Sequence, residues 1–170
     1  MDHRDVARNG LDEYLTVLKK TVDGLTPTEL YWQPSPNVNH IAWLVWHMAR
    51  VEDSWYNRYI GGGEPVWTAD GFCTRFRLPA DRGGYGDSAE DVAAFPKIDI
   101  GDLLEYFDAA RAKALGHLDG LTTENLAETH DDSRDDAPTV AWVLSHVLVE
   151  EGQHLGQAAY LRGMLRGLGN

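Results

Sequence analysis

The sequence has little cysteine, little positive charge and no long apolar run. Its 170 residues include one cysteine, Cys73, which excludes an intrachain disulfide. Lysine and arginine number 15 against 27 acidic residues, and the net charge of −12 disfavours binding to nucleic acid phosphates. The longest apolar run, residues 41–46, is far too short to cross a membrane, and the charged N-terminus is unlike a signal peptide. We expect a cytoplasmic protein with one domain over residues 1–170 and no membrane or nucleic acid partner.

The most informative stretch is residues 137–166, where apolar residues recur at helical spacing from Val140 to Leu165. We predict one long helix that begins near residues 136–139 and frays at Gly167 and Gly169. Polar residues interrupt its apolar stripe. These are His146, Glu150 and His154, each four residues apart, and Gln157 three residues later.

A four-residue step turns a helical side chain by only about 40°, so these polar groups lie nearly in line. A carboxylate among core residues needs a cation, a metal ion or several hydrogen bonds. Glu150 and His154 could therefore bind one metal ion together. The pair alone is a weak signal, because many Glu-x-x-x-His pairs are exposed ion pairs, and a third ligand must come from elsewhere.

Three more helices are predicted, over residues 6–25, from Asn37 or Asn39 to Tyr59, and over residues 99–118. In the second of them His47 lies among apolar residues and is expected to face the core, while His40 is expected to be half exposed. The three charged residues that follow His47 read as an exposed ion-pair set: Arg50, Glu52 and Asp53.

Residues 64–97 form a long connection rich in glycine and aromatic residues, with a short helix expected after Ser88. Two interpretations stay open. The aromatic residues and arginines cover or line a pocket, or the segment is a surface wrap whose aromatic residues are buried. The residues concerned are Trp67, Phe72, Phe76, Arg75, Arg77 and Arg82. The acidic run at residues 131–137 is expected to be a solvated loop.

An internal repeat supports a bundle. Residues 23–30, DGLTPTEL, resemble residues 119–126, DGLTTENL, and residues 41–47, IAWLVWH, resemble residues 140–146, VAWVLSH. Two helical hairpins joined by a long crossover make a four-helix bundle with a pseudo-twofold axis. The second and fourth helices then occupy equivalent places, which brings His47 within reach of Glu150 and His154.

Two segments, residues 43–53 (WLVWHMARVED) and 150–163 (EEGQHLGQAAYLRG), resemble the signature helices of the DinB-like superfamily. The likeness extends over nearly the whole chain and is stronger for the actinobacterial branch grouped with mycothiol-dependent enzymes such as maleylpyruvate isomerase. It implies an all-α, up-down-down-up four-helix bundle with a long crossover between its second and third helices.

The resemblance also implies a divalent metal ion, zinc or alternatively nickel, held by His47, Glu150 and His154. Many relatives have histidine at the position of Glu150, whereas the mycothiol-dependent members resemble this chain in using glutamate. His146 could be a further ligand, a hydrogen-bond partner of Glu150 or a structural residue, and we favour the last two. Gln157 could orient a ligand or a bound water, or only satisfy backbone groups. Arg50 could bind an acidic cofactor group, although an exposed ion pair is the commoner role. No catalytic side chain beyond the metal ligands is predicted.

Three protein ligands leave an open position on the ion, which is typical of catalytic sites. The resemblance implies that mycothiol or a similar thiol takes this position and attacks an electrophilic small molecule, so the chain is expected to be a metal-dependent thiol S-transferase or isomerase. The alternatives are a metal-dependent hydrolase and a non-catalytic bundle that binds a metal ion or ligand. The outer aromatic residues allow a homodimer without requiring one.

Overall fold

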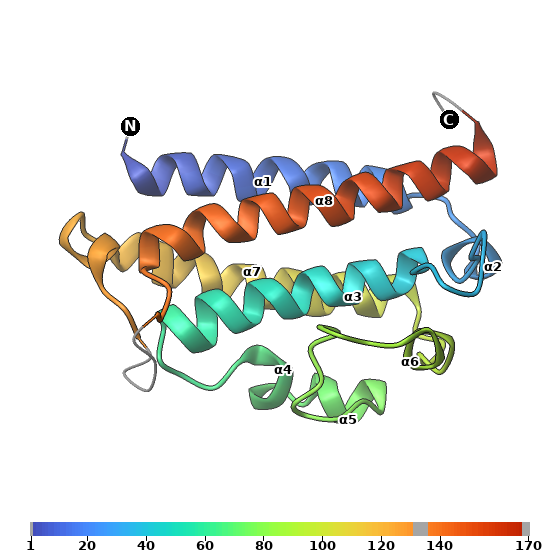
Figure 1. Cartoon of the computed structure of the whole chain (residues 1–170), viewed down its shortest axis with the longest axis horizontal. Helices are drawn as coiled ribbons and strands as arrows, with labels where there is room; N and C mark the ends of the chain where they lie inside the picture. Colours follow the sequence, from blue (N-terminus) through green and yellow to red (C-terminus); the bar gives the residue numbers. More distant parts are fainter. Residues whose placement is uncertain (1, 131–135, 168–170) are drawn as a thin grey trace.

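The computed structural model describes residues 2–130 and 136–167, and these residues form helices with no β-strand among them. Four long helices make up the bundle (Figure 1). They are α1 (His3–Val22), α3 (Ile41–Glu52) with its π-helical continuation η1 (Asp53–Ile60), α7 (Ile100–Gly120) and α8 (Val140–Arg166). The shorter elements are α2 (Pro27–Leu30), α4 (Val66–Ala69), α5 (Phe72–Phe76), α6 (Ala89–Ala93) and η2 (Glu124–Ala127).

The bundle has the expected up-down-down-up order. Helices α1 and α8 run in one direction, while α3 and α7 run in the other (Figure 1). Helix α8 packs on α1 and α3, and α3 packs on α7, so the second and fourth long helices are neighbours. The apolar faces predicted from helical spacing meet in one core, and α3 is buried along its whole length. None of the described helices is long and apolar enough to cross a membrane.

Local signals explain where the helices begin and end. Asp2 caps α1 and forms a capping box with Asp5, so this helix begins three residues earlier than predicted. Thr139 caps α8 by accepting a hydrogen bond from the Trp142 amide, as the sequence indicated. The acidic run at residues 131–137 lies mostly outside the described residues.

The start of α3 differs from the prediction. Neither Asn37 nor Asn39 is the cap: the Nδ1 atom of His40 accepts the Trp43 amide hydrogen at 3.0 Å. His40 is only 3% exposed rather than half exposed. Its ring packs beside Tyr31 and Phe95, and burial, with Lys97 nearby, lowers its pKa to about 4. The residue that caps α3 is therefore a histidine with a neutral imidazole ring.

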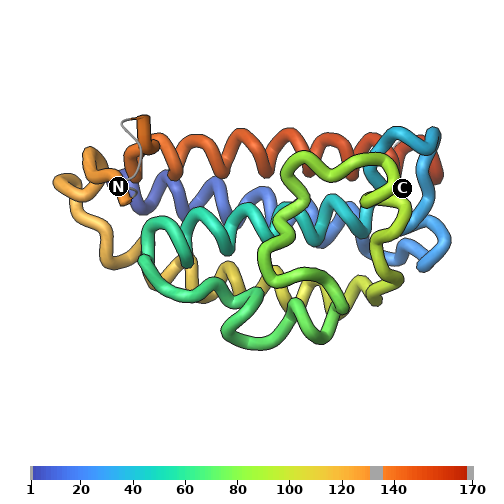
Figure 2. Tube along the Cα trace, turned by 60° about the horizontal axis from the view of Figure 1, so that its bottom comes forward, coloured from blue at the N-terminus to red at the C-terminus, as the bar shows by residue number. Residues whose placement is uncertain are grey.

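The crossover segment, residues 61–99, links α3/η1 to the parallel helix α7 and lies along one side of the bundle (Figure 2). Three of its aromatic residues, Trp67, Phe72 and Phe76, are buried in contact with Tyr106 of α7, whereas Tyr85 is exposed. The surface-wrap interpretation therefore holds for these three residues. Ser88 caps α6 with a capping box, as predicted.

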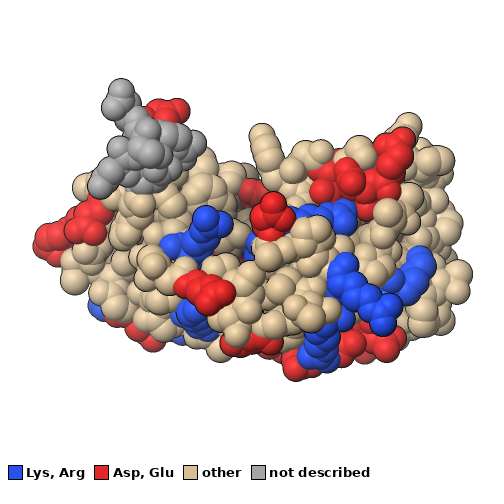
Figure 3. All heavy atoms as spheres, turned by 90° about the horizontal axis from the view of Figure 1, so that it is seen from below, with Lys and Arg blue, Asp and Glu red and all other residues tan. Residues whose placement is uncertain are grey.

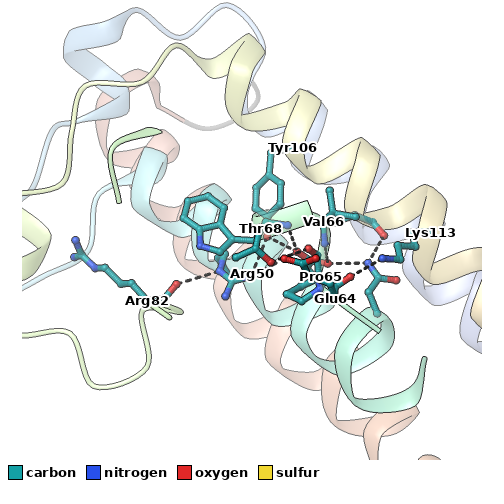
Figure 4. Close-up of polar contacts among 12 residues, drawn as sticks. Arg50, Glu64, Pro65, Val66, Thr68, Arg82, Tyr106 and Lys113 are labelled. Atoms are coloured by element: carbon teal, nitrogen blue, oxygen red, sulfur yellow. Dashed lines mark hydrogen bonds and ion pairs between the residues drawn. The ribbon is translucent and has the colours of Figure 1, made fainter. Parts of the chain in front are cut away.

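Buried polar groups fasten the crossover segment to the bundle (Figure 4). The Asp53 carboxylate accepts hydrogen bonds from the amides of Val66 and Trp67 at 2.9 and 2.8 Å and from the Tyr106 hydroxyl at 2.9 Å. Arg50 donates to the Arg82 carbonyl at 3.1 Å. These contacts hold the start of α4 and the loop around residue 82 against α3 and α7.

The prediction of an exposed charge set after His47 is thus wrong. Arg50, Glu52 and Asp53 are each at most 5% exposed, because α3 and η1 pack on α7 and α8 and the crossover segment covers another side. Glu52 forms a bidentate ion pair with Arg111 of α7, with N–O distances of 2.5 and 2.8 Å. The buried carboxylate is compensated in the way that its burial requires.

The surface arginines of the crossover segment are largely neutralised. Arg75 pairs with Asp102 and Glu105, and Arg82 pairs with Asp87 at 2.7 Å. On this face of the molecule, basic side chains accordingly lie in small groups among acidic ones (Figure 3). Neither Arg75 nor Arg82 is left unpaired to bind an anion.

Candidate metal centre

Three side chains from two helices converge where α3 packs against α8. His47 projects from α3, and Glu150 and His154 from successive turns of α8. One ligand atom of each lies within 4.8 Å of the others. The Oε1 atom of Glu150 is 3.5 Å from His47 Nε2 and 3.8 Å from His154 Nε2. The three residues predicted as ligands from the repeat and the resemblance are therefore neighbours in the structure.

These separations suit a shared ion better than direct hydrogen bonds, which are usually about 2.7–3.2 Å long. Ligand atoms at about 2.0–2.2 Å from a tetrahedral ion are about 3.4 Å apart, close to the observed 3.5 and 3.8 Å. Two imidazoles and one carboxylate are also a common donor set for zinc. The residues present fit a divalent metal ion.

Both imidazoles are oriented by a bond on their other nitrogen. His47 Nδ1 lies 2.6 Å from the carbonyl oxygen of Gly83, and His154 Nδ1 lies 3.3 Å from Oε1 of Gln157. A carbonyl oxygen accepts only, so each Nδ1 carries the hydrogen and each Nε2 of a neutral ring offers its lone pair. Partners of this kind fix the tautomer of metal-binding histidines.

The approach of Gly83 to His47 depends on the next residue. Gly84 has a φ of +89°, and a Cβ atom on it would lie 2.5 Å from His47 Nδ1. Glycine is therefore required at this position by both the backbone conformation and the space available. The crossover segment closes the His47 side of the site through this contact.

His146 contacts the second oxygen of Glu150. Its Nε2 atom is 2.8 Å from Oε2, one helical turn before the carboxylate. The pKa of Glu150 is lowered below its ordinary value, first by His154 and His47 and further by the nearby His146. Glu150 is thus held ionised with one oxygen toward the convergence point and the other toward His146.

The site is covered on one side and open on the other. The side chain of His47 is 6% exposed, whereas those of His154, Glu150 and His146 are 16, 22 and 31% exposed. Gln157 is exposed beside His154. A small molecule can therefore reach the convergence point from the α8 side.

Arg50 occupies a different place from the one predicted. Its guanidinium lies 5.0 Å from the centre of the Trp67 ring and bonds to the Tyr106 hydroxyl and the Arg82 carbonyl. These partners belong to the crossover segment and α7, so Arg50 secures that segment instead of facing a ligand. Cys73, on α5, also lies outside the group formed by His47, Glu150 and His154.

Sequence reasoning missed Glu151, which is fully buried on α8 and has no hydrogen-bond partner for either oxygen among the described residues. Burial, and then the Glu52 charge, raise its pKa well above the ordinary value. The signal was present in the spacing, because Glu151 follows Val147 by four residues and precedes Ala158 by seven, and both are core residues. The core stripe of α8 thus passes through Glu151, beside the line of His146, Glu150 and His154.

The repeat produces the same ring pair twice. Trp43 stacks on His47 with ring centres 4.7 Å apart and planes at 17°, and Trp142 stacks on His146 at 4.2 Å and 16°. In each pair the histidine follows the tryptophan by four residues along the helix. Because His47 and His146 then approach opposite oxygens of Glu150, the two halves of the molecule meet at one carboxylate.

Comparison with known proteins places the chain in a family. The model of the DinB superfamily matches residues 11–158. The structure of a conserved protein from Enterococcus faecalis is similar, with a TM-score of 0.87 over 98% of this chain and 99% of that one, and it shares the fold at 24% identity. No curated protein matches the chain significantly. Since the family model covers most of its length, the chain belongs to the DinB superfamily.

Proposed function

We propose that the protein binds a divalent metal ion through His47, Glu150 and His154 and transfers a low-molecular-weight thiol to an electrophilic small molecule. The observation that carries this proposal is the convergence of three ligand atoms, two of them on imidazoles whose other nitrogen is already bonded. Zinc is the ion we favour, because it suits this donor set.

The three protein ligands leave room for a fourth. A divalent ion in such a site lowers the pKa of a thiol that binds it and so supplies a thiolate at neutral pH. With one carboxylate among its ligands, the site keeps a net positive charge for that purpose. The open side at α8 is where the co-substrate would enter.

The nucleophile has to come from a co-substrate. The only cysteine, Cys73, is not one of the converging residues, and none of these carries a sulfur atom. In the proposed transfer, the thiol gives up its proton to solvent, its sulfur forms a bond to an electrophilic carbon, and the leaving group departs with the bonding electrons. The resemblance to mycothiol-dependent enzymes supports mycothiol or a similar thiol in this role.

The protein's own residues keep the ligands in place. Gly83 fixes the His47 ring, Gln157 fixes the His154 ring, and His146 holds the second oxygen of Glu150. Substitution of partners of this kind commonly weakens metal binding by about 10–100-fold. Gln157→Ala is therefore expected to reduce metal affinity while leaving the ligands themselves intact.

The test combines metal analysis with a transfer assay. Purified protein is expected to contain one equivalent of a divalent ion, and His47→Ala and Glu150→Ala are expected to lose it, while Cys73→Ser retains it. Metal-loaded protein should then accelerate the reaction of mycothiol with iodoacetamide above the rate with metal-free protein.

Two results would contradict the proposal. Full metal content in both ligand variants would show that these residues do not bind the ion. A metal-bound protein that transfers no thiol to any of several electrophiles would contradict the proposed activity. Hydrolysis of an ester or amide without added thiol would instead point to water as the nucleophile.

A further inference from the structure

The two tryptophan–histidine pairs created by the repeat have different surroundings. Trp43 is 4% exposed, whereas its counterpart Trp142 is 46% exposed. The first pair lies under the loop of residues 82–87 in the crossover segment. Among the described residues, no segment lies over the second pair as residues 82–87 lie over the first; residues 121–139, which join α7 to α8, correspond in the repeat to the connection between α1 and α3.

The loop over the first pair shows which groups can pack against such a pair of rings. Gly84 lies flat against it, since a Cβ atom there would be 3.0 Å from Trp43 and 2.5 Å from His47. The indole Nε1–H of Trp43 donates to the Asp87 carboxylate at 2.9 Å. The rings of the buried pair are thus covered by the backbone of this loop, and the indole N–H has one hydrogen-bond acceptor.

The second pair borders a groove instead. A hollow of about 530 Å³ is lined by Trp55 and Trp142, with residues 136–139 forming its far side. The two indoles meet edge to face, with centres 5.6 Å apart and planes at 66°. Volumes of about 300–1,000 Å³ are usual for small-molecule sites. The Trp142 indole N–H has no hydrogen-bond partner among the described residues.

The groove adjoins the candidate metal centre. Trp142 and Trp55 both contact the His146 ring, at 4.2 and 5.7 Å between centres, and His146 Nε2 is 2.8 Å from Glu150. One aromatic layer therefore separates the groove from a proposed metal ligand. A ring lying in the groove would have its edge close to the open side of the site.

Charge restricts the occupant. Among the described residues that line the groove, Asp136 alone is charged, and the whole chain carries a net charge of −12. Arg58 lines a neighbouring groove on the Tyr59 side of Trp55, not this one. An anion would approach a negatively charged protein and the Asp136 carboxylate, and none of the described lining residues is a cation that would offset the repulsion.

We infer that the Trp55–Trp142 groove binds a flat, uncharged aromatic ring that carries hydrogen-bond acceptor oxygens, such as a nitroarene or a quinone. The ring takes the place that Gly84 occupies over Trp43, and an acceptor oxygen takes the place of the Asp87 carboxylate. Under the proposed function, on which this assignment of role rests, the ring is the electrophilic co-substrate. With a chloronitroarene, the thiol sulfur replaces chloride at the ring carbon, and the thiol proton leaves to solvent.

Binding is tested first, without any reaction. Isothermal titration calorimetry of the protein with 2,4-dinitroaniline is compared with 4-amino-3,5-dinitrobenzoate, which adds a carboxylate to a similar ring. Aromatic stacking contributes about 0.5–1.5 kcal/mol beyond buried area, so Trp142→Ala is expected to weaken dinitroaniline binding by about 10-fold or more. The anionic ring should bind at least about 10-fold more weakly than the neutral one.

Two further variants complete the binding test. Ala137→Trp fills the groove while leaving Trp142 in place, and it should also abolish binding. Tyr160→Ala removes another exposed aromatic residue farther along α8 and should bind the ring normally. Unchanged affinity in both Trp142→Ala and Ala137→Trp, or equal affinity for the two rings, overturns the assignment of the groove.

The activity arm separates this inference from the proposed function. With mycothiol and metal-loaded protein, 1-chloro-2,4-dinitrobenzene should be used at least about 10-fold more efficiently than 4-chloro-3,5-dinitrobenzoate, relative to their uncatalysed rates. Trp142→Ala should lose this preference, whereas Tyr160→Ala should keep both the preference and the rate with iodoacetamide. Groove-dependent binding with no transfer to any electrophile would leave the groove standing and refute the proposed function. Transfer that ignores Trp142 would refute the role of the groove.

Discussion

At the scale of single residues, His40 shows how a titratable side chain can serve as a helix cap. Its Nδ1 atom accepts the Trp43 amide hydrogen, which requires a neutral ring, and its burial beside Tyr31 and Phe95 disfavours the charged form. The pKa of His40 is accordingly lowered from an ordinary 6.5 to about 4. A proton on His40 would therefore remove the cap and place a charge in the core.

This histidine should make folding sensitive to mild acid. Between about pH 6.5 and pH 4, the unfolded chain takes up the proton and the folded protein does not, so the free energy of unfolding falls as pH falls. The contribution is present in full above pH 6.5, and a shift from 6.5 to about 4 corresponds to about 3 kcal/mol. Urea denaturation in EDTA at several pH values measures it.

The matched variant is His40→Asn, which keeps a good helix cap and does not titrate. It is expected to be less stable near pH 7.5, because ring contacts are lost, but to lose less stability on acidification. A variant with the same pH dependence as the wild type would show that His40 is already protonated in the folded protein or is not buried in solution.

At the scale of elements, helical spacing was enough to find the four long helices, because each has an apolar face that packs on the others. Spacing could not show that α3 is buried on all sides. Arg50, Glu52 and Asp53 are charged and follow one another, which is typical of a solvated face. Their burial depends on partners distant in the sequence, such as Arg111 and the amides of Val66 and Trp67.

Asp53 ties three elements together, so its loss should loosen the crossover segment. Asp53→Asn replaces one acceptor oxygen with an NH₂ group that faces backbone donors. Losing a partner of several buried groups is expected to cost about 2–4 kcal/mol of unfolding free energy. Hydrogen exchange measured by mass spectrometry should rise over residues 61–99, and the exposed Asp70→Asn is the control. Unchanged exchange in Asp53→Asn would mean that the segment is held mainly by its buried aromatic residues.

At the scale of the whole molecule, the repeat explains how much of the site could be predicted. Equivalent positions of the second and fourth long helices meet near a common axis, so His47 could be placed near Glu150 and His154 without coordinates. The cover over His47 could not be predicted, since Gly83 and Gly84 lie in the crossover segment, which the repeat does not include. Nor could the exposure of Trp142, over which no described segment lies as residues 82–87 lie over Trp43.

Because the proposed ligands come from both halves of the repeat, an ion bound there would join α3 to α8 and stabilise the folded chain. A ligand that binds only the folded state at 100 times its Kd adds about 2.7 kcal/mol. For a domain of this size that corresponds to a Tm about 5–10 °C higher than in EDTA. Differential scanning calorimetry with and without zinc measures the difference.

His154→Ala should abolish that rise in Tm, whatever its own stability in EDTA, because one of the two α8 ligands is gone. His130→Ala should keep it, since His130 packs on Tyr59 outside the converging group. An equal zinc-dependent rise in both variants would mean that the ion binds elsewhere on this acidic chain. A rise confined to proteins that retain His154 would show that the two halves of the repeat are joined through the ion, which accounts for histidines on both helices facing one carboxylate.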